Sequence, residues 1–304
     1  MTPTAESTRT DRRSGARFWA LRILRLAVLS YVAVLGFLYV AQSWLIFPGR
    51  LSQGRAAAQV APGNRAELVH LTTASGDAVV ALFGGALDMG GLPVADSGAR
   101  PTLLFFYGNG DYLANNVTLF EDFRRRGINV AIAEYTGFGM SGGKPGEIGC
   151  RETAEVVFDH LASRPDVDAS RIFAAGWSLG SGVAVDLAGR RRVAGIVTFS
   201  AFTSLVDIAQ RTSPFIPVSW LLSHRFESEA KLRQLTCPVF LAHGTSDRMI
   251  PYSMSERLAA AATGPVTFVP VEGANHDDLF ATGGPKLLEA VVRFLTETSA
   301  RGVQ

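Results

Sequence analysis

The sequence predicts an α/β fold in which a mostly parallel central sheet is covered on both faces by helices. From residue 101 onward, short apolar segments with strand character alternate with segments whose apolar residues recur at helical spacing. The chain has 304 residues, 47% of them hydrophobic, which is enough to fill one large domain with an added segment. A long uncharged run near the N-terminus predicts a membrane helix ahead of that domain.

The N-terminal region combines a basic tail with this membrane helix. Residues 1–15 are polar and rich in Arg, Thr and Ser, which predicts a disordered tail. Residues 16–49 are expected to form a transmembrane anchor, because the uncharged part, residues 26–49, exceeds the roughly 20 residues that a helix needs to cross a bilayer. Basic residues gather ahead of that uncharged part: Arg9, Arg12, Arg13, Arg17, Arg22 and Arg25. This asymmetry predicts a single-pass protein with a cytoplasmic N-terminus and with residues 50–304 outside the cytoplasm.

A cleaved signal peptide is the alternative interpretation of the same run. However, the run is long for the apolar core of a signal peptide, and no clean Ala-x-Ala cleavage site follows it. These two features favour an uncleaved signal anchor.

Charge and cysteine content exclude several other functions. The formal net charge is only +2, and the arginines of the tail leave the remainder near neutral or acidic, which predicts no nucleic-acid partner. The two cysteines, Cys150 and Cys237, lack metal-ligand spacing, and a disulfide between them is not favoured. The histidines also lack such spacing, so neither a metal nor another cofactor is expected.

The elements of the domain can be placed in order along the chain. Residues 67–72 and 78–83 predict an antiparallel hairpin at one sheet edge, and residues 84–100 predict a surface loop. The parallel part is then expected from strands at 102–107, 128–134, 171–176, 194–200, 239–243 and 266–271, and from helices at 112–126, 151–163, 178–189, 253–262 and 285–299.

Residues 201–235 interrupt this alternation and predict a short cap insertion. The stretch is rich in proline and large apolar residues, and it lies between two predicted strands. We interpret it as the apolar wall of a substrate pocket, with Phe215 and Trp220 contacting substrate together with Trp177. The alternative is a surface helix that packs on the domain without touching substrate.

One Gly-x-Ser-x-Gly sequence has the surroundings that a catalytic nucleophile needs. Residues 172–176 predict a buried strand, residues 176–180 read Gly-Trp-Ser-Leu-Gly, and helical spacing follows at once. This arrangement predicts a sharp strand-to-helix turn with Ser178 at its tip. A second such sequence contains Ser141, but the glycines and proline that follow it cannot begin a helix.

A serine nucleophile needs a base and an orienting carboxylate, and later strands offer both. His276 lies in a glycine-containing loop after the last predicted strand, and Asp247 follows the preceding strand. The carboxyl ends of parallel strands share one edge of a sheet, so both side chains are expected to meet Ser178 there. Asp277 and Asp278 are rival acids, although a neighbour of the histidine rarely reaches back to its Nδ1 atom.

Two backbone N–H groups are candidates for stabilising a negatively charged oxygen in the reaction. One belongs to Leu179, at the start of the helix after the nucleophile. The other belongs to Asn109, in the loop after the first parallel strand. Gly108 and Gly110 on either side of it can also serve simply to form a tight turn.

Taken together, these motifs resemble the α/β-hydrolase superfamily. Within it, they resemble the membrane-anchored, bud-emergence-type (Bem-like) group of α/β-hydrolase-domain-containing proteins. The resemblance covers roughly residues 44–295 and rests on the motifs at 45–48, 107–110, 134–142, 176–180, 237–244 with Asp247, and 273–276. The chain order Ser178, Asp247, His276 matches that superfamily. The resemblance implies an α/β-hydrolase fold and places Ser141 in a structural turn. Two positions depart from the family pattern: Tyr107 replaces a common His, and Glu134-Tyr135-Thr136 replaces Asp-Tyr-Arg.

The predicted function is that of a serine hydrolase acting through an acyl-enzyme on a carboxylic ester or thioester. The anchor and the apolar cap favour a small-molecule or lipid-like ester with a hydrophobic acyl group. A peptidase or amidase of the same fold is the first alternative. The second is a membrane-tethered binding module without catalysis, against which the filled triad positions argue.

Overall fold

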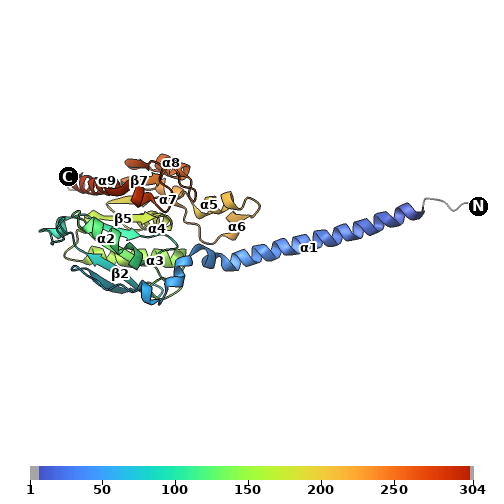
Figure 1. The fold of residues 1–304 in the computed structure, drawn as a ribbon, viewed down its shortest axis with the longest axis horizontal. Helices are drawn as coiled ribbons and strands as arrows, with labels where there is room; N and C mark the ends of the chain where they lie inside the picture. The colour runs from blue at the N-terminus through green and yellow to red at the C-terminus, as the bar shows by residue number, and fades with distance from the viewer. Residues whose placement is uncertain (1–6, 302–304) are drawn as a thin grey trace, which may run out of the picture.

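The computed structural model describes residues 7–301 and begins with a long isolated helix. Helix α1, Ser7–Ile46, extends away from the rest of the chain (Figure 1). Its Arg17–Ile46 part is long and apolar enough to cross a membrane, with a mean hydropathy of 2.1. The helix includes residues 7–15, for which the composition had predicted disorder, while residues 1–6 of that predicted tail lie outside the described residues.

An eight-stranded sheet forms the centre of the domain, in the order β1-β2-β4-β3-β5-β6-β7-β8. Strand β1 pairs antiparallel with β2, and β2 antiparallel with β4; every other pairing is parallel. The predicted mostly parallel sheet with an antiparallel hairpin at one edge is confirmed. The strands are β1 Glu67–Thr72, β2 Ala78–Gly84, β3 Thr102–Phe106, β4 Asn129–Glu134, β5 Ile172–Trp177, β6 Gly195–Phe199, β7 Val239–Gly244 and β8 Val266–Val271.

Helices follow the parallel strands, with three differences from the predicted boundaries. The first is α2, which is shorter than expected because Leu113–Asn116 before it is a 3-10 turn. The second is α3, which begins earlier and buries Cys150 within it. The third is α9, where a break at Gly284, with a φ of 51°, separates an added first part from the helix that begins at Pro285 as predicted. The main helices are α2 Val117–Arg124, α3 Glu147–Ser163, α4 Leu179–Ala188, α8 Tyr252–Ala261 and α9 Leu279–Arg301.

The cap insertion contains three short helices, α5 Leu205–Thr212, α6 Val218–Leu221 and α7 Ser228–Leu232. Helices α5 and α6 lie on the side of the domain from which α1 projects (Figure 1). The Tyr31 hydroxyl donates to the Phe215 carbonyl at 2.7 Å. Nearer the end of α1, Gln42 Oε1 accepts from the Ser223 N–H at 2.7 Å. The cap is therefore attached along the C-terminal part of α1.

The end of α1 enters the core of the domain. Phe47 is fully buried, with its ring edge-on to His224 at a centroid separation of 5.1 Å. Ser43 Oγ lies 2.7 Å from His224 Nε2, so the same histidine also contacts the last turns of α1. At Gly49 any Cβ would lie 2.2 Å from the Phe138 ring, which explains why a glycine follows the Phe-Pro pair. The junction is thus part of the folded domain rather than a flexible connector.

Candidate active site

Ser178 lies at the tip of the sharp turn between β5 and α4. Its backbone has φ 54° and ψ −119°, a conformation that side-chain-bearing residues rarely adopt. The flanking glycines are required by close contacts: a Cβ at Gly180 would lie 2.0 Å from the Phe106 carbonyl oxygen, and one at Gly176 would lie 2.0 Å from that of Gly180. The glycines of the pentapeptide therefore allow the sharp turn that holds Ser178 at its tip in strained backbone.

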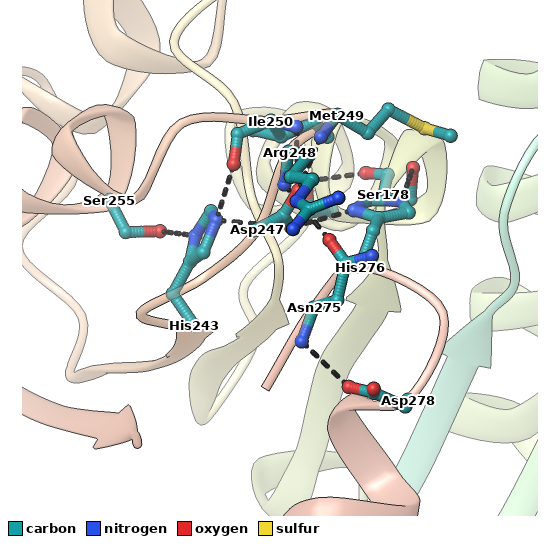
Figure 2. A network of polar contacts seen from close by, with 11 residues as sticks. Ser178, His243, Asp247, Arg248, Met249, Ile250, Ser255, Asn275, His276 and Asp278 are labelled. Atoms are coloured by element: carbon teal, nitrogen blue, oxygen red, sulfur yellow. Dashed lines mark hydrogen bonds and ion pairs between the residues drawn. The ribbon is translucent and has the colours of Figure 1, made fainter. Parts of the chain in front are cut away.

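The structure brings His276 and Asp247 to this serine (Figure 2). His276 Nε2 lies 3.0 Å from Ser178 Oγ, and His276 Nδ1 lies 2.8 Å from Asp247 Oδ2. This geometry fits a neutral imidazole that donates from Nδ1 to the carboxylate and accepts from the serine hydroxyl at Nε2. All three side chains are nearly buried. Residues 98 positions apart in the chain thus form one continuous hydrogen-bonded row.

Asp247 is held as a carboxylate by several donors. Burial raises its pKa, but hydrogen bonds from His243, His276 and the Ile250 N–H outweigh burial and leave the pKa well below its usual value. The second carboxylate oxygen, Oδ1, accepts from the N–H groups of Met249 at 2.9 Å and Ile250 at 2.7 Å. The carboxylate is therefore ionised and fixed in orientation at neutral pH.

The two rival acids are placed elsewhere. Asp278 Oδ1 accepts from the backbone N–H of Asn275 at 2.7 Å, which stabilises the turn that carries His276. Asp277 is exposed. Of the three candidate carboxylates, Asp247 is the one that contacts the histidine.

His243 is a residue of this site that the sequence analysis did not assign. It ends β7 and is fully buried, with Nε2 2.9 Å from the Ile250 carbonyl oxygen and 3.3 Å from Asp247 Oδ2. Its Nδ1 lies 2.6 Å from Ser255 Oγ (Figure 2). The imidazole therefore donates toward the carboxylate from the side opposite His276. Its position at the end of a strand, four residues before Asp247, was the available signal.

The two candidate oxyanion donors belong to segments next to the serine, the start of α4 and the loop after β3. Leu179 is the first residue of α4, so its N–H has no intrahelical acceptor. The loop after β3 also comes close, because a Cβ at Gly108 would lie 3.6 Å from the Cβ of Ser178. Asn109 in that loop is tied to the end of α1: its side-chain Nδ2 donates to the Ile46 carbonyl at 2.8 Å, and its own carbonyl accepts from Gly49 at 2.9 Å.

The three side chains expected to contact substrate do not gather in one place. The Trp177 ring lies against the His276 ring, with centroids 5.3 Å apart. Phe215 and Trp220, in contrast, are 88% and 91% exposed in the cap. They line no enclosed pocket, which differs from the expected apolar wall. This part of the cap contacts α1 through the Phe215 backbone carbonyl, and the Phe215 and Trp220 side chains point to solvent.

The rival serine and the two family departures occupy one buried cluster. Ser141 Oγ donates to the Glu134 carbonyl at 2.9 Å and accepts from the Val80 N–H at 3.0 Å, so its hydroxyl is fully engaged in a turn. The Tyr107 hydroxyl donates to Glu134 Oε1 at 2.6 Å. Burial raises the pKa of Glu134, although hydrogen bonds from Tyr107, Leu113 and Met140 oppose that shift. The two departures are therefore partners in one contact.

Comparison with known proteins identifies a matching family and relatives of similar sequence. Residues 97–228 match the family described as serine aminopeptidase, S33. Uncharacterized protein Rv2307c of Mycobacterium tuberculosis is 32% identical over 285 residues, which cover 93% of this chain and 97% of the relative. Alpha/beta hydrolase domain-containing protein 17B of Xenopus tropicalis is 30% identical over 200 residues, which cover 66% of this chain and 67% of the relative. The chain belongs to the α/β-hydrolase superfamily.

Solved structures share the fold of this α/β-hydrolase. A puromycin-hydrolyzing peptidase of Mycobacterium tuberculosis superposes with a TM-score of 0.65 at 19% identity, over 80% of this chain and 40% of that chain. The Pyrococcus furiosus esterase Pf2001 gives a TM-score of 0.60 at 17% identity, over 77% of this chain and 92% of that chain. The expectation of a hydrolase is confirmed at the level of the superfamily, while these neighbours include both esterases and a peptidase.

Proposed function

We propose that this α/β-hydrolase is a membrane-anchored serine hydrolase that cleaves carboxylic ester or thioester bonds of hydrophobic acyl substrates. Ser178 is the nucleophile, His276 the general base and Asp247 the carboxylate that orients the base. The hydrogen-bonded row from Asp247 Oδ2 through the imidazole to Ser178 Oγ, with separations of 2.8 Å and 3.0 Å, is the observation that carries the proposal.

Acylation begins when Ser178 Oγ attacks the acyl carbon. The hydroxyl proton moves to His276 Nε2 as the bond to carbon forms, and the ionised Asp247 stabilises the resulting imidazolium. The negative charge that develops on the acyl oxygen is stabilised by hydrogen bonds donated by the N–H groups of Leu179 and Asn109. Collapse of this intermediate breaks the bond to the alcohol or thiol, which leaves with the proton from His276.

Deacylation repeats these steps with water. His276, neutral again, takes a proton from a water molecule, whose oxygen attacks the acyl carbon of the Ser178 ester. The tetrahedral intermediate forms against the same donors and collapses to release the carboxylic acid. The proton on His276 returns to Ser178 Oγ, which restores the resting site.

The membrane anchor supports a hydrophobic substrate. The apolar Arg17–Ile46 segment carries the domain, and the last residues of α1 lie within hydrogen-bond distance of the candidate oxyanion loop through Asn109. An N-terminus in the cytoplasm with the domain on the other side follows from the arginines that precede the span. The proposed placement in the bud-emergence-type group rests on the motifs along the chain. It also rests on 29% identity over 216 residues to Alpha/beta hydrolase domain-containing protein WAV2 of Arabidopsis thaliana.

The direct test is covalent labelling followed by turnover. The full chain in detergent is treated with a fluorophosphonate probe and assayed with p-nitrophenyl esters of increasing acyl length. We expect labelling and hydrolysis by the wild type, loss of both in Ser178→Ala, and retained labelling in Ser141→Ala. Hydrolysis that persists unchanged in Ser178→Ala would refute the assigned nucleophile.

A peptidase or amidase is the second candidate, because the matching family is described as a serine aminopeptidase. The same three side chains can cleave amides, provided that His276 protonates the departing amine. Matched ester and amide substrates with the same acyl group would separate the two activities. A higher kcat/KM on the amide would replace the esterase proposal. A protein that neither labels nor hydrolyses would instead be a membrane-tethered binding module.

A further inference from the structure

The cap lies at a definite height along the anchor helix. The Tyr31 hydroxyl contacts the Phe215 carbonyl, and Gln42 contacts Ser223 and Leu221. Because an α-helix rises 1.5 Å per residue, these contacts follow α1 for about 16 Å. The cap therefore contacts α1 over several helical turns, and not only at the end of the helix.

The charged residues of α1 determine where the cap lies relative to a bilayer. The hydrocarbon core needs about 20 residues of helix. Arg22 and Arg25 can extend their side chains toward the N-terminal boundary, but a span including Arg17 or earlier arginines would bury more charge. The core then begins between residues 20 and 26 and ends between residues 39 and 45. Every such register contains Tyr31, and it places the Phe215 contact about 12–21 Å from the domain-side boundary of the hydrocarbon layer.

The cap sequence at this height is suited to hydrocarbon. Residues 212–223 carry no charge, and Arg211 and Arg225 lie on either side of them. Phe215 and Trp220 are almost fully exposed, an unusual state for large apolar side chains in water. An exposed aromatic pair on an uncharged loop is the pattern expected of a membrane-facing surface.

Most backbone polar groups of the loop also have partners within the protein, which lowers the cost of placing them in hydrocarbon. The prolines at 214 and 217 have no N–H group to satisfy. The Pro214 carbonyl accepts from Gln210 Nε2 at 3.1 Å, and that of Phe215 accepts from Tyr31. Five N–H groups of this loop bond within it or to α5: Ser213 to Ala209, Ile216 to Ser213, Val218 to Ile216, and Trp220 and Leu221 to Pro217.

A small apolar groove separates α1 from the cap. It has a volume of about 180 Å³, and its lining comes mainly from apolar side chains of both elements. Ile46 is one of these residues, and its carbonyl accepts from Asn109 Nδ2 in the candidate oxyanion loop. The groove thus extends along α1 as far as Ile46, which is bonded to the loop that carries Asn109.

We propose that residues 212–223 of the cap insert into the hydrocarbon core of the membrane from the side of the catalytic domain, where Phe215 and Trp220 contact phospholipid acyl chains. The groove between α1 and the cap is then open to hydrocarbon and receives an acyl chain from the bilayer. This inference rests on the proposed membrane anchor and extends it: the substrate reaches Ser178 from the lipid and not from the aqueous phase.

The test is a depth measurement on the full chain in phosphatidylcholine vesicles. A nitroxide is attached to Phe215→Cys in a Cys237→Ser background, in which the remaining Cys150 is buried. Collision with oxygen, which enters lipid, is compared with collision with a water-soluble nickel chelate. We expect the Phe215 label to match one at Leu29→Cys in α1 and to differ from one at Met89→Cys, an exposed apolar position in the loop before β3.

The outcomes separate the two proposals. A Leu29 label in lipid with a Phe215 label in water overturns the inference and leaves the anchor in place. Low collision of the Phe215 label with both reagents means protein contact, as with a second copy, and also overturns it. A Leu29 label in water overturns the anchor and the inference together.

A functional measurement gives a second, independent readout. Phe215→Asp and Trp220→Asp place a charge at hydrocarbon depth, whereas Phe215→Leu and Trp220→Leu keep the surface apolar. We expect the aspartates to lower the rate on a vesicle-embedded long-chain ester, relative to a soluble short ester, by about tenfold or more. The leucine variants are expected to keep the wild-type ratio. An unchanged ratio in both aspartate variants, with folded protein, would contradict the inference.

Discussion

The backbone strain at Ser178 can be measured with two inactive variants. Ser178→Ala and Ser178→Gly both remove the hydroxyl and its contact with His276, so they differ only in the Cβ atom. At φ 54° and ψ −119° a residue with a Cβ carries about 1–3 kcal/mol of strain, which glycine does not. The Ser178→Gly variant loses about 0.4–1 kcal/mol of folding stability, because glycine gives the unfolded chain more conformational freedom. The same variant lacks the alanine methyl group, whose burial contributes up to roughly 0.8 kcal/mol of stability.

These terms leave Ser178→Gly more stable than Ser178→Ala by about 1 kcal/mol, which corresponds to about 2–4 °C in Tm for a domain of this size. Calorimetry of the two variants in the same detergent gives the difference directly. The control is Ala260→Gly in α8, where ordinary helical backbone predicts a loss of about 1 kcal/mol. If Ser178→Gly is no more stable than Ser178→Ala, the turn is not strained and the reasoning fails.

Four further predictions concern three residues around the serine. Asp247→Asn should lower kcat by about 10⁴ because an amide cannot stabilise the imidazolium, as measured by ester hydrolysis with KM determined separately. The lowered pKa of Asp247 stabilises the fold above its usual pKa of about 4, so the stability gap between wild type and Asp247→Asn should shrink as pH falls below that value. A pH-independent gap would contradict this. Asn109→Ala should lower kcat about tenfold or more at similar KM, since the side chain holds the oxyanion loop against Ile46. His243→Ala should lower kcat by about 10–100-fold through loss of one hydrogen bond to a charged group, while Ser255→Ala should have a smaller effect.

The sheet could be predicted because its strands are buried on both faces. Apart from the partly exposed Trp177, strands β3 to β7 consist of buried residues, and such strands read in the sequence as mostly apolar runs. Once the order of parallel strands is known, their carboxyl ends must share an edge, which is why Asp247 and His276 could be paired with Ser178. Their roles in catalysis stay part of the proposal, although the geometry is the one expected.

The residues that the sequence did not indicate are those whose function depends on a contact across the fold. His243 looks like the last residue of a buried strand, and only coordinates show its Nε2 beside the carboxylate of Asp247. The first part of α9, before the break at Gly284, was also missed, because Gly283, Gly284 and Pro285 together indicate a loop. The placement of the cap depends on Tyr31, far earlier in the chain, which no local pattern connects with Phe215.

The loop that carries Asn109 is held from two directions, and this connects α1, the proposed anchor, with the proposed oxyanion donor. From the core, Glu134 Oε1 accepts from the Tyr107 hydroxyl and from the Leu113 N–H at 2.9 Å, on either side of the loop. From the membrane side, the Ile46 carbonyl at the end of α1 accepts from the Asn109 side chain. An oxyanion donor works only if it is already in place when charge develops. The end of α1 is therefore one of the two supports of that donor, so an anchor shifted relative to the domain would reduce kcat even with Ser178, His276 and Asp247 intact.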